Sequence, residues 1–127
     1  MTDLDALELA VDAARIADDE HGANIVVLEV GDVLAIAEFF VIVSASNRRL
    51  VRTLVEEVEV QLRERTGRSP RRTEGVNEQQ WVLVDYGDVV VHVFLAEIRE
   101  FYEIERLYTD VPAIDWRADP PAPVMRA

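Results

Sequence analysis

Two aspartates, Asp85 and Asp88, come nearest to a catalytic arrangement in this chain of 127 residues. A close pair of carboxylates on one strand can hold Mg²⁺ for phosphoryl transfer, because this metal prefers oxygen ligands. These two, however, flank Tyr86-Gly87, where the chain is expected to turn sharply. We therefore expect no magnesium site and no phosphoryl transfer at this pair.

Other catalytic chemistries have few candidate residues. The chain has no cysteine, which excludes thiol catalysis, disulfides and thiolate metal sites. His92 lies among valines, where a buried structural role is expected, and His21 precedes a glycine at the end of a predicted helix. Ser44 or Ser46 would need His92 as a base to act as a nucleophile, and the spacing gives no support for that. We expect no enzyme, no metal and no cofactor.

The net charge of -12 argues against a protein that grips nucleic acid mainly through phosphates, which needs a basic surface. It favours a basic protein as partner, although acidity also serves solubility alone. No apolar run approaches the ~20 residues of a membrane-spanning helix, and no signal peptide is visible. We expect a soluble cytoplasmic protein with little nucleic-acid contact.

Most of the positive charge gathers in one region of the sequence. An RNA-binding patch is one interpretation of these arginines, and a solvated helix face that pairs with neighbouring glutamates is the other. We favour the second, because no aromatic residues are interleaved for base stacking. The arginines are Arg48, Arg49, Arg52, Arg63, Arg65, Arg68, Arg71 and Arg72, and the glutamates are Glu56, Glu57, Glu59 and Glu64.

The hydrophobic pattern predicts an α/β fold, with a mixed sheet of about five strands and flanking helices. An N-terminal helix ends near Gly22, and a second helix begins after a Ser46 or Asn47 cap and ends at Gly67. A last helix, single or broken, follows the final strand. The strands are expected at 24–30, 38–44, 69–74 and in a hairpin over 80–95.

In the hairpin, a two-residue turn at Tyr86-Gly87 would place Asp85 opposite Asp88 and Trp81 opposite His92. One face then carries only valines and is expected to be core. The other face mixes aromatic, histidine and carboxylate side chains, and it suits contact with a helix or a partner. The valines are Val82, Val84, Val89, Val91 and Val93, and the mixed face holds Trp81, Leu83, Asp85, Asp88, Val90, His92 and Phe94.

A long motif in this stretch resembles the signature of the ribosomal silencing factor (Iojap/RsfS) family. It reads Trp81-x-Leu83-x-Asp85-Tyr86-Gly87-Asp88-Val89-x-Val91-His92-Val93-Phe94, then Arg99-x-Phe101-Tyr102-x-x-Glu105-Arg106-Leu107. The likeness extends from about Leu4 to Asp110. It implies a fold related in outline to nucleotidyltransferases. The chain lacks their catalytic motif, because Ser44-Ala45-Ser46 has no glycine and no Asp-x-Asp follows on one strand.

The resemblance also implies a function. Family members bind the large ribosomal subunit through its basic protein number fourteen at the intersubunit face, block joining of the small subunit and so repress translation. Relatives in organelles act in assembly of the large subunit. A nucleotidyltransferase-like enzyme is the weaker alternative. A homodimer of the free protein is also expected, because a bare apolar patch tends to pair with itself.

Residue by residue, the resemblance assigns partner binding to the hairpin and the segment after it. Tyr108 stands where the family often has tryptophan, Glu103 replaces an aspartate and Ile104 a leucine. Phe94 and Phe101 are expected in the core. The predicted partner-binding residues are Trp81, Asp85, Tyr86, Gly87, Asp88, Tyr102, Glu105, Leu107 and Tyr108.

The domain organisation expected from the sequence is one domain over residues 1–111 and a tail over 112–127. Four of the five prolines lie in this tail. We expect them to prevent regular structure there and to leave the tail mobile.

Overall fold

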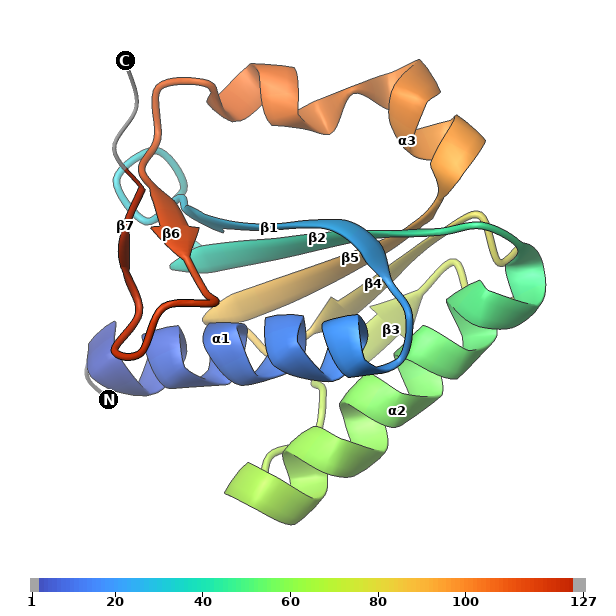
Figure 1. The fold of residues 1–127 in the computed structure, drawn as a ribbon, viewed down its shortest axis with the longest axis horizontal. Coiled ribbons are helices and arrows are strands. Elements are labelled where there is room, and N and C mark those ends of the chain that lie inside the picture. Colours follow the sequence, from blue (N-terminus) through green and yellow to red (C-terminus); the bar gives the residue numbers. More distant parts are fainter. Residues whose placement is uncertain (1–2, 125–127) are drawn as a thin grey trace.

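The computed structural model describes residues 3–124 and shows a mixed sheet with helices on both faces (Figure 1). The predicted α/β class is confirmed, and the sheet has seven strands in the order β3-β4-β5-β2-β1-β6-β7. Its five predicted strands are β1 to β5, and β6 and β7 come from the tail. The strands are β1 (Ala23–Glu29), β2 (Phe39–Ala45), β3 (Arg72–Glu74), β4 (Trp81–Asp85), β5 (Val89–Leu95), β6 (Ala113–Asp115) and β7 (Ala122–Pro123). The helices are α1 (Asp3–Asp19), α2 (Arg48–Thr66), α3 (Ala96–Tyr102) and the 3-10 helix η1 (Ile104–Tyr108).

Strands β2 and β5 form the parallel centre of the sheet. They pair from Phe39 with Val89 to Ala45 with Leu95. Every residue of β2 is buried, as its continuous apolar run predicts for a strand covered on both faces. Because the two strands are parallel, their carboxyl ends lie at the same edge of the sheet, and α2 and α3 both begin there.

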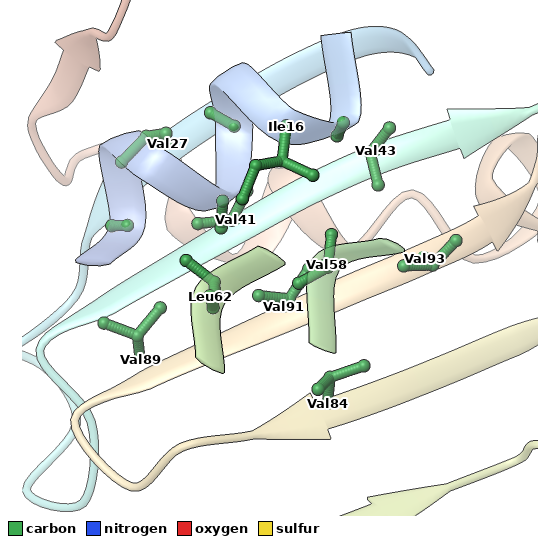
Figure 2. Packing of buried hydrophobic residues seen from close by; sticks show 14 of the residues in the cluster. Ile16, Val27, Val41, Val43, Val58, Leu62, Val84, Val89, Val91 and Val93 are labelled. Carbon is green, nitrogen blue, oxygen red and sulfur yellow. The ribbon is translucent and has the colours of Figure 1, made fainter. Parts of the chain in front are cut away.

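Helices α1 and α2 cover one face of the sheet (Figure 1). The Asn47 side chain caps α2 by accepting a hydrogen bond from the Leu50 N–H at 2.8 Å, and Gly67 ends the helix at φ 76°. Figure 2 shows Ile16 of α1 and Leu62 of α2 over the valines of β2, β4 and β5. The all-valine face of the hairpin is therefore core, as predicted.

The register of the hairpin differs from the prediction by two residues, because each residue of β4 lies opposite the residue of β5 two positions beyond the expected one. Asp85 lies opposite Val90, and Trp81 lies opposite Phe94. The turn is Gly87-Asp88, because the Tyr86 N–H donates to the Val89 carbonyl at 2.9 Å. Gly87 takes φ 93° at the first turn position, where glycine is favoured. The shift leaves each side chain on its predicted face, since two residues are one full period of a strand.

The expectation that prolines prevent regular structure in the tail is wrong for the start of this segment. Strand β6 pairs with β1, with Ile114 opposite Val27, and so extends the sheet. Ile114 and Trp116 are each 7 % exposed. Burial of these apolar side chains outweighs the local cost of Pro112, which precedes the strand and needs no ladder hydrogen bond there. The mobility of the tail and the domain boundary between residues 111 and 112 stay predictions.

Trp116→Ala is expected to lower the free energy of unfolding by about 3 kcal/mol, because it leaves a cavity and removes a hydrogen bond. The indole N–H of Trp116 donates to the Ile25 carbonyl at 3.2 Å, and the Arg15 guanidinium donates to the Trp116 carbonyl at 3.2 Å. Urea unfolding followed by circular dichroism measures the effect. Val124→Ala, at a 43 % exposed position, is the control, and equal small losses in both variants would indicate a detached tail.

Candidate protein-binding surface

The side chain of Trp81 lies on the face of the sheet away from α1 and α2. It stacks on Phe94 with 4.7 Å between ring centroids, and its indole N–H donates to His92 Nδ1 at 3.2 Å. The Tyr102 ring lies 5.2 Å from it, between centroids. The structure thus brings together two predicted site residues that are far apart in the sequence, Trp81 and Tyr102. Phe94 is fully buried, as predicted.

The segment formed by α3 and η1 exposes three large apolar side chains. Phe101 and Leu107 are each 78 % exposed, and Tyr102 is 54 % exposed. We call these three residues, together with Trp81, the aromatic surface. The prediction that Phe101 belongs to the core is wrong, because α3 is only seven residues long and turns the other side of this helix toward the sheet. The exposure of Phe101 could not be predicted from the sequence, because seven residues are too few to show which side of the helix faces the sheet.

A left-handed residue separates α3 from η1. Glu103 takes φ 46°, and its N–H donates to the Arg99 carbonyl, which ends α3. The chain then turns so that Ile104 joins the buried hydrophobic cluster that contains Phe40 and Phe94. Tyr108 also faces inward, with its ring 5.3 Å from Phe40, and is partly buried. The substitution of tryptophan by tyrosine at position 108 therefore concerns packing as much as a surface contact.

A buried arginine fastens this segment to the sheet. Arg99 is 8 % exposed. One of its terminal nitrogens donates to the Asn24 carbonyl at 2.7 Å and to Ser44 Oγ at 2.8 Å, and the other donates to Glu105 Oε2 at 2.8 Å. Glu105, a predicted partner-binding residue, thus serves first as the counter-charge of Arg99. No role was predicted for Arg99 from the sequence, although its place in the family motif was a signal that could have drawn attention to it.

The turn carboxylates are neutralised within the chain. Asp85 accepts the Gly87 N–H at 2.8 Å and pairs with Arg72 at 3.1 Å. Asp88 pairs with Arg68 at 2.7 Å, and its two carboxylate oxygens accept hydrogen bonds from the two terminal nitrogens of that arginine. Arginines of the chain itself therefore neutralise both carboxylates of the turn.

Tyr86 lies on the opposite face of the hairpin from Trp81. It is 3 % exposed, Arg68 lies 6.0 Å from its ring centroid, and burial raises the pKa of its hydroxyl to about 12. The structure therefore divides the predicted site residues between two places. A partner contact of Tyr86 would require the turn to open, whereas Trp81, Tyr102 and Leu107 reach the surface directly.

The arginines of α2 make few of the expected direct ion pairs with glutamates of the same helix. Within residues 3–124, no ion pair joins Arg48, Arg49 or Arg63 to a glutamate of this helix. Arg65 instead donates to the Gln61 side chain at 3.2 Å. Arg63 nevertheless interacts with Glu59 at longer range, where its positive charge acts to lower the pKa of that carboxyl against the larger effect of burial. The arginines of this helix are therefore solvated as predicted, and their pairing with glutamates is limited to such weaker interactions, because long exposed side chains gain little from direct pairs in water.

His92 is buried beneath the aromatic surface, and desolvation lowers its pKa from 6.5 to about 4. Between these two values the unfolded chain binds more protons than the folded chain, so stability falls as the pH is lowered through this window. We expect a loss of about 2 kcal/mol from pH 7.5 to about pH 5. Urea unfolding against pH, beside non-titrating His92→Asn, measures it. Curves of equal slope would contradict a neutral buried histidine.

Over residues 3–124, no group of three histidine, aspartate or glutamate side chains converges to hold a metal. In the same range, no helix is long and apolar enough to cross a bilayer. The fold and the aromatic surface are those of an acidic α/β protein with a group of exposed apolar side chains on α3 and η1.

Comparison with known proteins places this α/β protein in a family. The family model described as "Ribosomal silencing factor during starvation" matches residues 3–126. The chain is 35 % identical to Ribosomal silencing factor RsfS of Halalkalibacterium halodurans, over 91 % of this chain and 95 % of that protein. It is 36 % identical to that of Bacillus subtilis, over 81 % and 86 %. The chain therefore belongs to the ribosomal silencing factor family.

A more distant relative and a solved structure agree with this assignment. The chain is 32 % identical to Mitochondrial assembly of ribosomal large subunit protein 1 of Mus musculus, over 71 % of this chain and 40 % of that protein. A crystal structure of a Chromobacterium violaceum protein has a TM-score of 0.75 and 33 % identity. The match covers 86 % of this chain and 88 % of that one.

Proposed function

We propose that this chain binds the large ribosomal subunit through its basic protein number fourteen at the intersubunit face. Bound there, it blocks joining of the small subunit and represses translation. Membership of the silencing-factor family supports the ribosomal target. The observation that carries the contact itself is the exposure of Phe101, Tyr102 and Leu107 on one short segment of a chain with net charge -12.

The aromatic surface has the properties of a binding hot spot. Tyrosine and tryptophan supply large contact areas and lose few rotamers on binding. Trp81 holds one side of the Tyr102 ring, so this contact is partly organised before the partner arrives. Glu100 and Glu103 are both exposed and close to Tyr102 in the sequence, and Glu103 is paired with Arg106 at 3.5 Å. An apolar centre with an acidic rim is complementary to a basic protein.

Silencing of this kind is a steric mechanism. It needs occupancy of the intersubunit face and no turnover, so it requires neither a cofactor nor a catalytic residue. The proposed site of action is the cytoplasm. When the protein is free, the aromatic surface pairs with that of a second copy, and this homodimer dissociates before the ribosome binds. A silencing complex that retains the intact dimer would contradict this order of events.

A role in assembly of the large subunit is the second candidate function. The name of the mouse relative, which refers to such assembly, favours it. The two roles differ in their target. A silencing factor binds mature large subunits, whereas an assembly factor binds precursors and its loss makes them accumulate.

Subunit joining, followed by light scattering with purified subunits, tests the proposal. Preincubation of large subunits with the chain is expected to reduce the amplitude of joining in proportion to occupancy. Tyr102→Ala should restore joining, and Val60→Ala, at an exposed apolar position on α2, should block joining as the wild type does. Unimpaired joining at saturating wild-type protein would contradict silencing.

A further inference from the structure

A groove of about 450 Å³ lies on the outer face of the sheet, between β3 and the loop that precedes β2. Ile36 and Phe40 line it on one side, and Leu83 and Val90 line it from the strands of the hairpin. Ile36 is 83 % exposed, the most exposed of the large apolar side chains described. The groove thus offers apolar contacts that nothing in the described chain covers.

His92 also lines this groove and carries a polar atom without a partner. The residue is 6 % exposed, and its Nδ1 accepts the indole N–H of Trp81 at 3.2 Å. A neutral imidazole that accepts at Nδ1 carries its proton on Nε2. This Nε2–H is buried and has no hydrogen-bond partner. A buried donor without an acceptor costs free energy, which a bound acceptor would recover.

The other polar side chains of the groove differ in whether they have a partner. Arg72 engages the carboxylates of both Asp85, at 3.1 Å, and Glu74, at 3.5 Å. The side chain of Arg71, by contrast, makes no hydrogen bond or ion pair within residues 3–124. The groove therefore has two donors without a partner, His92 Nε2 and the Arg71 guanidinium, whereas its two carboxylates are each paired with Arg72. An occupant should bring an apolar side chain and acceptor oxygens.

We propose that the groove binds an extended peptide segment of the ribosomal partner, with an aliphatic side chain between Ile36 and Leu83 and a main-chain carbonyl on His92 Nε2. A peptide matches both requirements, because main-chain carbonyls lie next to aliphatic side chains. Water does not reach Nε2 in the free chain, so binding includes movement of a lining side chain. This inference rests on the proposed function and identifies a second contact region beside the aromatic surface.

N-acetyl-leucinamide is the probe for this chemistry, since it carries one aliphatic side chain and two carbonyls. In amide NMR spectra of the full chain, it is expected to shift Leu83 and Val90 saturably and to leave Val60 unmoved. His92→Asn keeps an acceptor for the Trp81 indole N–H and removes the Nε2 donor. This variant should bind the probe about fivefold more weakly, with the Trp81 indole resonance unchanged. No saturable shift in the wild type would overturn the inference.

A second variant guards against misfolding of His92→Asn. Ile36→Glu changes an exposed side chain and should preserve the fold, yet it places an acceptor and a charge in the groove and should abolish the probe shifts. Both variants are expected to bind purified large subunits about tenfold more weakly than the wild type. If the wild type binds subunits and both variants bind equally well, the groove inference fails and the proposed function stands. If the wild type does not bind them, the proposed function fails, and the probe titration alone decides whether the groove binds peptide.

Discussion

Tyr102→Ala is expected to lower the affinity for large ribosomal subunits about 30-fold or more, because a central aromatic side chain in an interface commonly contributes 2 kcal/mol or more. Tyr102 combines 54 % exposure with a packed contact to Trp81, so the ring is both available and held in place. Affinity can be measured by titrating a fluorescently labelled chain with purified subunits.

The control for this prediction is Val60→Ala, which removes an exposed apolar side chain from α2. It should leave the affinity unchanged. Both variants should keep the wild-type circular dichroism spectrum and unfold within about 1 kcal/mol of the wild type, since both positions are exposed. If Tyr102→Ala binds as tightly as Val60→Ala, the aromatic surface is not the interface.

Arg99→Ala is expected to lower the free energy of unfolding by about 2–3 kcal/mol, because it leaves the Ser44 hydroxyl and the Asn24 carbonyl without their donor and removes the counter-charge of the partly exposed Glu105. The same arginine ties α3 to the Asn24 carbonyl near β1. Its loss should therefore also loosen the segment that carries the aromatic surface. Urea unfolding measures stability, and hydrogen exchange of the α3 amides measures the local effect.

Two further variants sharpen this test. Arg106→Ala breaks an exposed pair with Glu103, whose side chains are 78 % and 51 % exposed, and should change stability by less than about 0.5 kcal/mol. Adding Glu105→Gln to Arg99→Ala should recover part of the loss, because the stranded charge is then removed. A loss in Arg99→Ala no greater than in Arg106→Ala would show that the buried pair does not fasten α3.

The hairpin shows how much of the fold the sequence could predict. Alternation of apolar residues assigns Val82, Val84 and Val91 to the core, and the structure buries all three completely or nearly so. The register was harder to predict, because Tyr86-Gly87 and Gly87-Asp88 are both plausible two-residue turns by composition. The hydrogen bond between Tyr86 and Val89 decides between them. An error of two residues in the register leaves each side chain on its correct face of the sheet, but it assigns the wrong cross-strand partner to each residue.

The candidate site was less predictable than the fold. The motif placed Trp81 and Tyr102 in one interface, and the structure does bring their rings together. It could not show that Tyr86 points to the other face, because the identity of a residue in a turn does not fix its direction. The strand at Ala113–Asp115 was missed because proline content outweighed a short apolar run.

Co-sedimentation with purified ribosomal subunits tests the central claim most directly. The wild-type chain is mixed with large subunits or with small subunits, and each mixture is separated on a sucrose gradient. The account predicts that the chain migrates with large subunits and stays at the top of the gradient with small ones. A chain that remains at the top with both, or that migrates equally with both, would contradict specific binding to the large subunit.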